Sequence, residues 1–233
     1  ASTATYIDRY GVLKTADIDK PRFEKEGYLN EGSSTNLVTN SNIFTHPEWG
    51  NATNTLVGGY PSPDGTNNAT LATTINTDSC AIFKSVVFSA NTATISVFAK
   101  AGTSSSLTLR FVNYDTTLFC SFNLANKTVS NTNGKLIELS NGWFRCSLSI
   151  TFTGTDLNGS VYCYLATDVG TNYNSNSGNS MYIYGFQAES LPFATSYIPT
   201  TNSTVARSAD VLQVTRENNF PNAESNKEGY SVA

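Results

Sequence analysis

The residues of this 233-residue chain that are best suited to ligand chemistry are aromatic rings, arginines and one glutamine placed beside apolar positions. They are Arg110, Trp143, Arg145, Tyr162, Tyr164 and Gln187. A sugar needs this mixture, because its C–H face stacks on aromatic rings. Its hydroxyl groups hydrogen-bond to the planar guanidinium of arginine and to the side-chain amide of glutamine. We therefore expect these six side chains to form a glycan-binding platform on one concave sheet.

A packing role competes with ligand binding for the same side chains. A Trp beside an Arg is a common structural pair, and an N-terminal arm or the long segment 40–68 could cover both Trp143 and Arg145. Trp49 and Tyr60 lie within that segment and could line an edge of the platform. For these two rings, anchoring of the segment is the favoured interpretation.

Catalytic chemistry finds little support in the sequence. His46 is the only histidine and stands in a Thr-His-Pro context, so no nucleophile–base arrangement is indicated. The carboxylates that could form a glycosidase pair are scattered over turns and strand ends: Asp115, Glu138, Asp156, Asp168 and Glu189. We therefore expect a protein that is not an enzyme.

The four cysteines are predicted to be free, buried thiols. They are Cys80, Cys120, Cys146 and Cys163, and none belongs to a CxxC motif or a close Cys/His pair, which argues against zinc. The last three occupy apolar positions of alternating stretches, where a free cysteine behaves as a small hydrophobic residue.

The stretch 142–152, GWFRCSLSITF, shows the strictest alternation in the chain. Side chains of a strand point to opposite faces with a period of two. Phe144, Cys146, Leu148, Ile150 and Phe152 therefore share one apolar face, which we predict to be buried against a second layer.

Further strand signals recur at regular spacing, separated by turns such as Asn133-Gly134. The predicted strands are 69–75, 81–88, 93–100, 106–113, 118–124, 136–139, 142–152, 161–166 and 181–187. No stretch has a convincing helical period. Many short strands with regular turns favour an all-β, two-sheet sandwich.

Three regions are expected along the chain. Residues 1–31 are rich in charge and are interpreted as an extended N-terminal arm or a small hairpin, with a solvated linker as the competing interpretation. Residues 32–212 are interpreted as the β-sandwich, and residues 213–233 as a tail or the start of another domain. Residues 40–68 are expected to be irregular, because Asn, Gly and Pro dominate them, and such long connections are often binding loops.

Composition narrows the classes of function. The net charge of −4 gives no electrostatic footprint for nucleic acid. No apolar run approaches the roughly 20 residues that span a bilayer. The N-terminal residues lack a basic region followed by an apolar core, so we expect no signal peptide, and the abrupt beginning is expected for a piece of a longer chain.

Several phrases of the sequence resemble a known family. They include EGSSTNL at 31–37, SVFAKAG at 96–102, GWFRCSLS at 142–149, YIYGFQAE at 182–189 and PFATSYIPTTNSTVARSAD at 192–210. Together they resemble the carbohydrate-binding-module-like jelly-roll domains of bacteriophage tail fibres and tailspikes. The resemblance implies a jelly-roll sandwich in a virion, assembled in the bacterial cytoplasm.

Three functions follow from the residues and the resemblance together. The first is a non-catalytic module that binds host cell-surface polysaccharide. The second is a structural module that contacts other tail subunits, as a homo-oligomer or otherwise. The third is an accessory domain of a polysaccharide depolymerase. Related sandwiches often hold a structural calcium ion, which the resemblance allows, although no dense run of Asp and Asn ligands supports one here.

Overall fold

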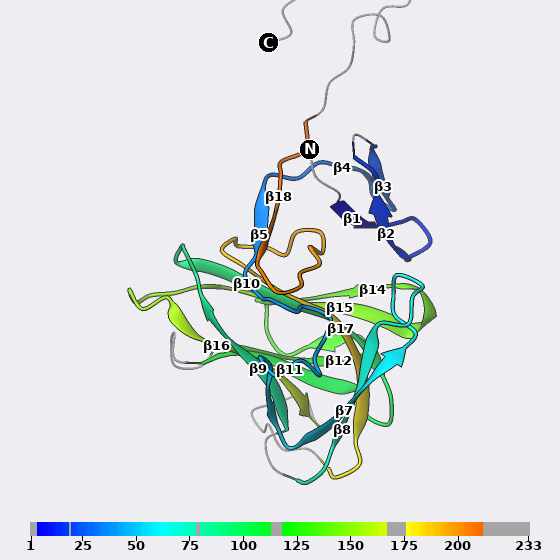
Figure 1. Cartoon of the computed structure of the whole chain (residues 1–233), viewed down its shortest axis with the longest axis vertical. Helices are drawn as coiled ribbons and strands as arrows, with labels where there is room; N and C mark the ends of the chain where they lie inside the picture. Colours follow the sequence, from blue (N-terminus) through cyan, green and yellow to red (C-terminus); the bar gives the residue numbers. More distant parts are fainter. Residues whose placement is uncertain (1–3, 19, 78–79, 113–117, 167–175, 212–233) are drawn as a thin grey trace, which may run out of the picture.

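The computed structural model describes residues 4–18, 20–77, 80–112, 118–166 and 176–211 (Figure 1). These residues form two six-stranded antiparallel sheets and three two-stranded ones, without an α-helix. The first sheet runs β14 (Gly134–Glu138), β15 (Trp143–Thr151), β10 (Thr92–Ala101), β17 (Ser180–Glu189), β8 (Ala69–Thr74), β7 (Asn54–Tyr60). The second runs β13 (Thr128–Val129), β12 (Phe119–Asn123), β11 (Ser106–Val112), β16 (Asn158–Ala166), β9 (Ala81–Val87), β6 (Gly50–Ala52).

The strand order is that of a jelly roll. From β8 onwards, β8 pairs with the last strand of the two sheets, β17, and the next strand, β9, pairs with β16. In the same way β10 pairs with β15, and β11 pairs with β12. The chain is thus a long antiparallel hairpin rolled up so that successive pairs alternate between the two sheets. This confirms the predicted all-β, two-sheet jelly-roll sandwich.

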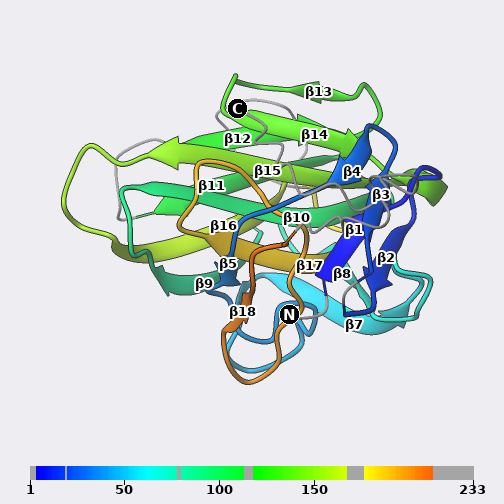
Figure 2. The same cartoon turned by 90° about the horizontal axis from the view of Figure 1, so that it is seen from above.

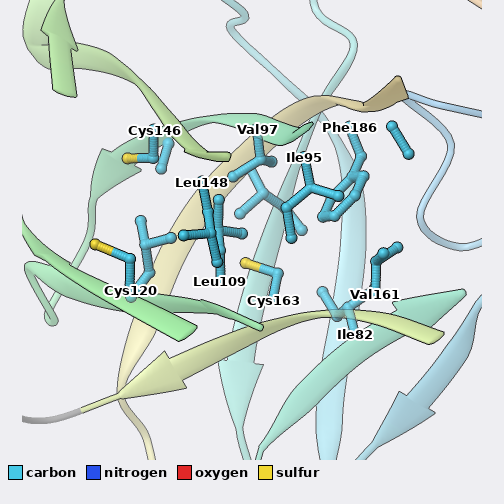
Figure 3. Close-up of a cluster of buried hydrophobic side chains, with 14 of the residues drawn as sticks. Ile82, Ile95, Val97, Leu109, Cys120, Cys146, Leu148, Val161, Cys163 and Phe186 are labelled. Atoms are coloured by element: carbon cyan, nitrogen blue, oxygen red, sulfur yellow. The ribbon is translucent and has the colours of Figure 1, made fainter. Parts of the chain in front are cut away.

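The main hydrophobic core lies between the two sheets, and Figure 3 shows Leu148 and Ile95 of the first sheet facing Leu109 and Cys163 of the second. The predicted core face of β15 is confirmed, because Phe144, Cys146, Leu148, Ile150 and Phe152 are all buried. All four cysteines are free and buried, as predicted. Burial raises the pKa of the Cys163 thiol to about 12 and also raises that of Cys146.

β17 contains a bulge that changes which of its side chains point toward the main core. Gly185 has φ +61°, and the register between β10 and β17 shifts at Ser96 and Phe98. As a result Ile183 and Phe186 both reach the main core although they are three residues apart. A Cβ atom at position 185 would lie 3.0 Å from Tyr197 Cζ, which is a tight contact. Glycine therefore also fits this position because it has no side chain.

Residues 4–18 and 20–31 form two short hairpins, in line with the hairpin interpretation of this region, and they lie over the outer face of the first sheet (Figure 2). The hairpin strands are β1 (Ala4–Ile7), β2 (Leu13–Ala16), β3 (Arg22–Glu24) and β4 (Gly27–Leu29). Leu13 joins Phe98, Leu139 and Trp143 in a second, smaller hydrophobic cluster beneath the hairpins. This packing buries Trp143 on the outer face of β15, opposite the core face of the same strand.

A buried ionic cluster ties the hairpins to the two ends of the sandwich. The Arg22 guanidinium donates to Glu31 Oε2 at 2.8 Å, to Ser196 Oγ at 2.9 Å and to the Asp210 carboxylate. Arg207, at the end of β18 (Val205–Arg207), lies 3.5 Å from Glu31, and β18 pairs with β5 (Ser34–Asn36). The EGSSTNL and ARSAD phrases therefore meet in one cluster.

The ionic cluster predicts acid sensitivity. Burial alone would raise the pKa of Glu31, but hydrogen bonds from Ser196 and the charges of Arg207 and Arg22 outweigh it, so the pKa lies below its ordinary value of 4.5. A carboxyl group with a lowered folded-state pKa stabilises the protein above its unfolded-state pKa, and this contribution is lost as pH falls. Urea melts from pH 7 to pH 3 should show falling stability, with a flatter profile for Glu31→Gln. An equally steep profile for the variant would contradict the role given to Glu31.

The expectation that residues 40–68 are irregular is wrong in part. Residues 50–52 and 54–60 form β6 and β7, which close one edge of each sheet. The edge position and the register shift between Val57 and Tyr60 account for the weak alternation that concealed β7. Trp49 is an anchor, as favoured, because its indole N–H donates to Asn40 O at 2.9 Å and its ring packs on Phe186.

Three of the sequence-based expectations concern residues that the structure does not describe. The 213–233 region, Asp115 and Asp168 lie outside the described residues. Within the described residues, no helix is long and apolar enough to cross a membrane.

Candidate functional site

The structure does not gather the six candidate ligand-binding residues on one sheet. Trp143, Arg145 and Gln187 belong to β15 and β17 of the first sheet. Arg110, Tyr162 and Tyr164 belong to β11 and β16 of the second sheet, and the main core separates the two sets. The expectation of a single platform is therefore wrong, because alternation identifies the polar face of each strand but not the sheet to which the strand belongs.

Two of the six side chains are enclosed by protein. Trp143 lies under the N-terminal hairpins in the smaller hydrophobic cluster. Gln187 is fully buried: its Oε1 accepts from the Ile198 N–H at 2.6 Å, and its Nε2 donates to Thr195 O and Ser196 O. Gln187 thus holds residues 192–204, which we call the closing segment, against the first sheet. Neither Gln187 nor Trp143 lies at a surface where a ligand would bind.

Arg145 is also buried, with 6% of its surface exposed, but it lines a groove. Its Nη2 donates to Ser96 Oγ at 3.0 Å, and its guanidinium carbon lies 5.3 Å from the centre of the Phe98 ring. Burial lowers the pKa of Arg145, while Glu189 and more distant carboxylates oppose this shift. Nε of Arg145 is buried and has no hydrogen-bond partner within the described part of the chain.

The groove has a volume of about 650 Å³, which is within the usual range for small-molecule sites. It runs over β14 and β15 and is bounded on its other side by residues 192–194. Its lining combines amide, hydroxyl and cationic groups with one exposed ring: Asn133, Lys135, Arg145, Ser147, Ser149 and Phe193. These groups can hydrogen-bond to hydroxyls and stack on an apolar face, as a saccharide requires.

Alternation and the closing segment together build this groove. Arg145, Ser147 and Ser149 are alternate residues of β15, so they project from the outer face opposite to the core residues. Lys135 lies opposite Ser147 in the register between β14 and β15. Pro192 and Phe193 come shortly after β17, which ends at Glu189, and Phe193 is 58% exposed. Sequence reasoning missed Lys135 and Phe193, because only the β14–β15 pairing and the path of the closing segment bring them to Arg145.

The remaining candidates form a second surface, on the outer face of the other sheet. Tyr162 lies between Phe83 and Arg110 in the strand register. The rings of Phe83 and Tyr162 are stacked at 4.7 Å, and those of Tyr162 and Tyr164 at 5.4 Å. Phe83 and Tyr162 are partly exposed, whereas Tyr164 is buried. We call Phe83, Tyr162 and Tyr164 the ring column.

Gly50 makes room for the ring column. A Cβ atom at this position of β6 would lie 2.3 Å from Phe83 Cε2, so the Phe83 ring rests over the glycine backbone. Phe83 was not among the predicted site residues, although alternation along the strand places it on the face opposite to the buried Ile82 and Val86. Within the described residues the Tyr162 hydroxyl has no hydrogen-bond partner, which leaves it available to a ligand.

The polar residues considered for catalysis have structural partners. His46 Nδ1 lies 3.3 Å from both Asn40 Nδ2 and the Glu48 backbone nitrogen. Glu189 is fully buried and accepts from Ser34 and Thr195, and Glu138 pairs with Lys127 at 2.7 Å. Among the described residues, no group of three or more His, Cys, Asp or Glu side chains is arranged to hold a metal ion.

Comparison with known proteins gives likenesses in structure only, since no family model and no curated protein matches the chain. One similar structure is the enzymatically active domain of tailspike protein 4 of bacteriophage CBA120, with TM-score 0.41 and 12% identity. That match covers 66% of this chain and 21% of the tailspike chain, so our chain spans about a fifth of its length.

Two carbohydrate-binding modules are similar at the same level. TmCBM61, solved with β-1,4-galactotriose, has TM-score 0.40 and 12% identity over 66% of this chain and 97% of that one. The CBM22-1 xylan-binding domain of Paenibacillus barcinonensis Xyn10C has TM-score 0.39 and 11% identity over 70% and 94%.

Proposed function

We propose that this chain is a non-catalytic carbohydrate-binding module of a phage tail fibre or tailspike that helps the virion engage host cell-surface polysaccharide. The observation that carries the proposal is the groove along β15, in which hydroxyl, amide and guanidinium groups face one exposed ring. The resemblance of the closing PFATSYIPT…ARSAD phrase to tail-fibre and tailspike domains supports the phage setting.

Weak binding at a single groove is compatible with a role in a fibre, because a fibre presents several copies of the groove. A shallow polar site gains modest free energy, because each saccharide hydroxyl exchanges water for a protein partner of similar strength. Several copies presented on one particle would raise the overall affinity without any new contact, provided that their spacing matches the polysaccharide. Hydrolysis is not part of the proposal, and a depolymerase activity would belong to another part of the full-length protein.

The test replaces the exposed ring of the groove. Phe193→Ala should weaken binding of host polysaccharide about two- to twelvefold, since it removes an aromatic contact worth about 0.5–1.5 kcal/mol. The melting temperature should hold, because the ring is 58% exposed. Phe23→Ala is a matched control: Phe23 is also 58% exposed but lies on the N-terminal hairpins. Affinity electrophoresis of both variants beside the parent measures the effect.

The ring column provides the second arm of this test. If Tyr162→Ala loses binding while Phe193→Ala binds like the parent, the glycan lies on the second sheet and the groove assignment is wrong. Full binding by both variants would contradict both surfaces.

A structural module is the second candidate function. It is favoured by the exposed pair Phe23 and Tyr28, whose rings meet edge to face at 5.8 Å on the hairpins. Exposed aromatic residues suit protein interfaces as well as sugars. Loss of subunit association in Phe23→Ala, with no glycan binding by the parent, would favour this function.

A further inference from the structure

The groove contains an unpaired buried arginine, whereas the other fully enclosed arginines of the described chain have carboxylate partners. Arg22 and Arg207 are each 2% exposed, and both contact Glu31. Arg145 is 6% exposed and forms no ion pair with a described residue. Burying a charge is costly unless an opposite charge and hydrogen bonds compensate it, so an unpaired arginine beside a groove indicates a partner that is not part of this chain.

The groove around Arg145 is cationic. The described residues that line it include Lys135 and Arg145 but no aspartate or glutamate. Lys135 is exposed and, within the described residues, it too forms no ion pair. Glu189, Glu31 and Glu24 attract Arg145 over a longer distance, and none reaches it as an ion-pair partner. An anionic group that entered the groove would therefore meet two cations at close range.

The charge is also placed asymmetrically. A smaller hollow of about 210 Å³ adjoins the groove at Arg145 and Lys135 and extends beneath the N-terminal hairpins. Glu24 and Glu31 line that hollow and would repel an anion there. The favourable place for negative charge is thus the end of the groove that is lined by Asn133, Ser147 and Phe193.

We propose that the groove selects acidic saccharides and seats the carboxylate of a uronic-acid residue on the Arg145 guanidinium. Arg145 lines the groove, and a guanidinium forms strong, charge-assisted hydrogen bonds with a carboxylate. Lys135 adds a second positive charge, the Ser147 and Asn133 side chains hydrogen-bond to ring hydroxyls, and Phe193 covers an apolar sugar face. This inference rests on the proposed function, since it names the class of glycan for the same groove.

The experiment compares two ligands that differ only in charge. The probes are a tetramer of α-1,4-linked galacturonate and the same tetramer after its carboxyl groups have been reduced to alcohols. At low ionic strength the acidic tetramer should bind at least about tenfold more tightly, since hydrogen bonds between charged groups are the strong ones. Titration calorimetry gives the affinities, and amide chemical shifts of Asn133 and Ser147 show whether the groove is occupied.

The outcomes separate this inference from the proposed function. Equal affinity of the two tetramers in the groove would overturn selectivity for acidic sugars but leave glycan binding intact. Absence of shifts in the groove with either tetramer would overturn the uronic-acid assignment, whereas the proposed function would be overturned only if host polysaccharide also failed to bind there. Displacement of the acidic tetramer by an equal concentration of inorganic phosphate would overturn the carboxylate assignment and favour a phosphate-bearing glycan.

Substitutions of Arg145 and Lys135 test whether these two side chains cause the preference for acidic saccharides. Arg145→Gln should reduce the preference for the acidic tetramer to about unity. If that variant fails to fold, Lys135→Gln provides the test, because it changes only an exposed side chain. It should weaken binding of the acidic tetramer about threefold and leave binding of the neutral tetramer unchanged. Lys127→Gln is the matched control, because Lys127 is exposed and lies outside the groove. An unchanged preference in Lys135→Gln would contradict the charge argument.

Discussion

Replacing Arg22 by Met should lower the free energy of unfolding by about 3–5 kcal/mol, the range observed when one partner of a buried ion pair is removed. Arg22 contacts both Glu31 and Asp210, so the variant leaves the partly buried Asp210 carboxylate without its cation and leaves Glu31 with Arg207 alone. It also removes the hydrogen bonds from the guanidinium to Thr5 O and Ser196 Oγ. Denaturant melts at neutral pH measure the loss.

A matched variant shows whether burial is the cause. Lys127 also pairs with a glutamate, Glu138, but both side chains are more than half exposed. Lys127→Met should cost less than about 1 kcal/mol, because water screens exposed ion pairs. If Arg22→Met costs no more than Lys127→Met, the ionic cluster does not hold the hairpins to the sandwich.

Truncation of Leu148 should be the other large effect, with a loss of about 2–5 kcal/mol for Leu148→Ala. Leu148 is fully buried, lies opposite Ile95 in the β10–β15 register, and packs between the two sheets. The substitution removes buried methyl groups and leaves a cavity, and both costs add. Urea melts of the variant and the parent give the difference.

The control for Leu148→Ala is Val87→Ala on β9, where the side chain is 64% exposed. This control should change the free energy of unfolding by less than about 0.5 kcal/mol. A loss below about 1 kcal/mol for Leu148→Ala would mean that the faces of β15 had been assigned backwards.

The sandwich could be predicted from the sequence because each main strand is marked by the alternation of residues within its own short stretch of chain. Alternation of apolar residues along 142–152 assigns Phe144, Cys146 and Leu148 to the core, and the structure confirms each of them. The positions of the main strands follow from the same period and from the turns between them. Edge strands such as β7 are harder to find, because half-exposed positions there need not be apolar.

The site could be predicted only in part, because its parts are distant in the chain. Alternation shows that Trp143 and Arg145 share the outer face of β15, yet it says nothing of what covers that face. Leu13 covers Trp143, while Phe193 and Lys135 frame the groove beside Arg145. Alternation along β16 likewise places Tyr162 outward but cannot assign it to the opposite sheet. Such assignments depend on strand pairing.

The central claim is that glycan binds in the groove along β15, and chemical-shift mapping tests it most directly. An array of bacterial surface polysaccharides would first choose the glycan, and fragments of it would then be titrated into the labelled parent protein. We predict saturable shifts that cluster at Asn133, Ser147, Ser149 and Ala194, the residues that line the groove. The claim would be contradicted if the protein bound no glycan on the array, or if the shifts were confined to the ring column at Phe83 and Tyr162.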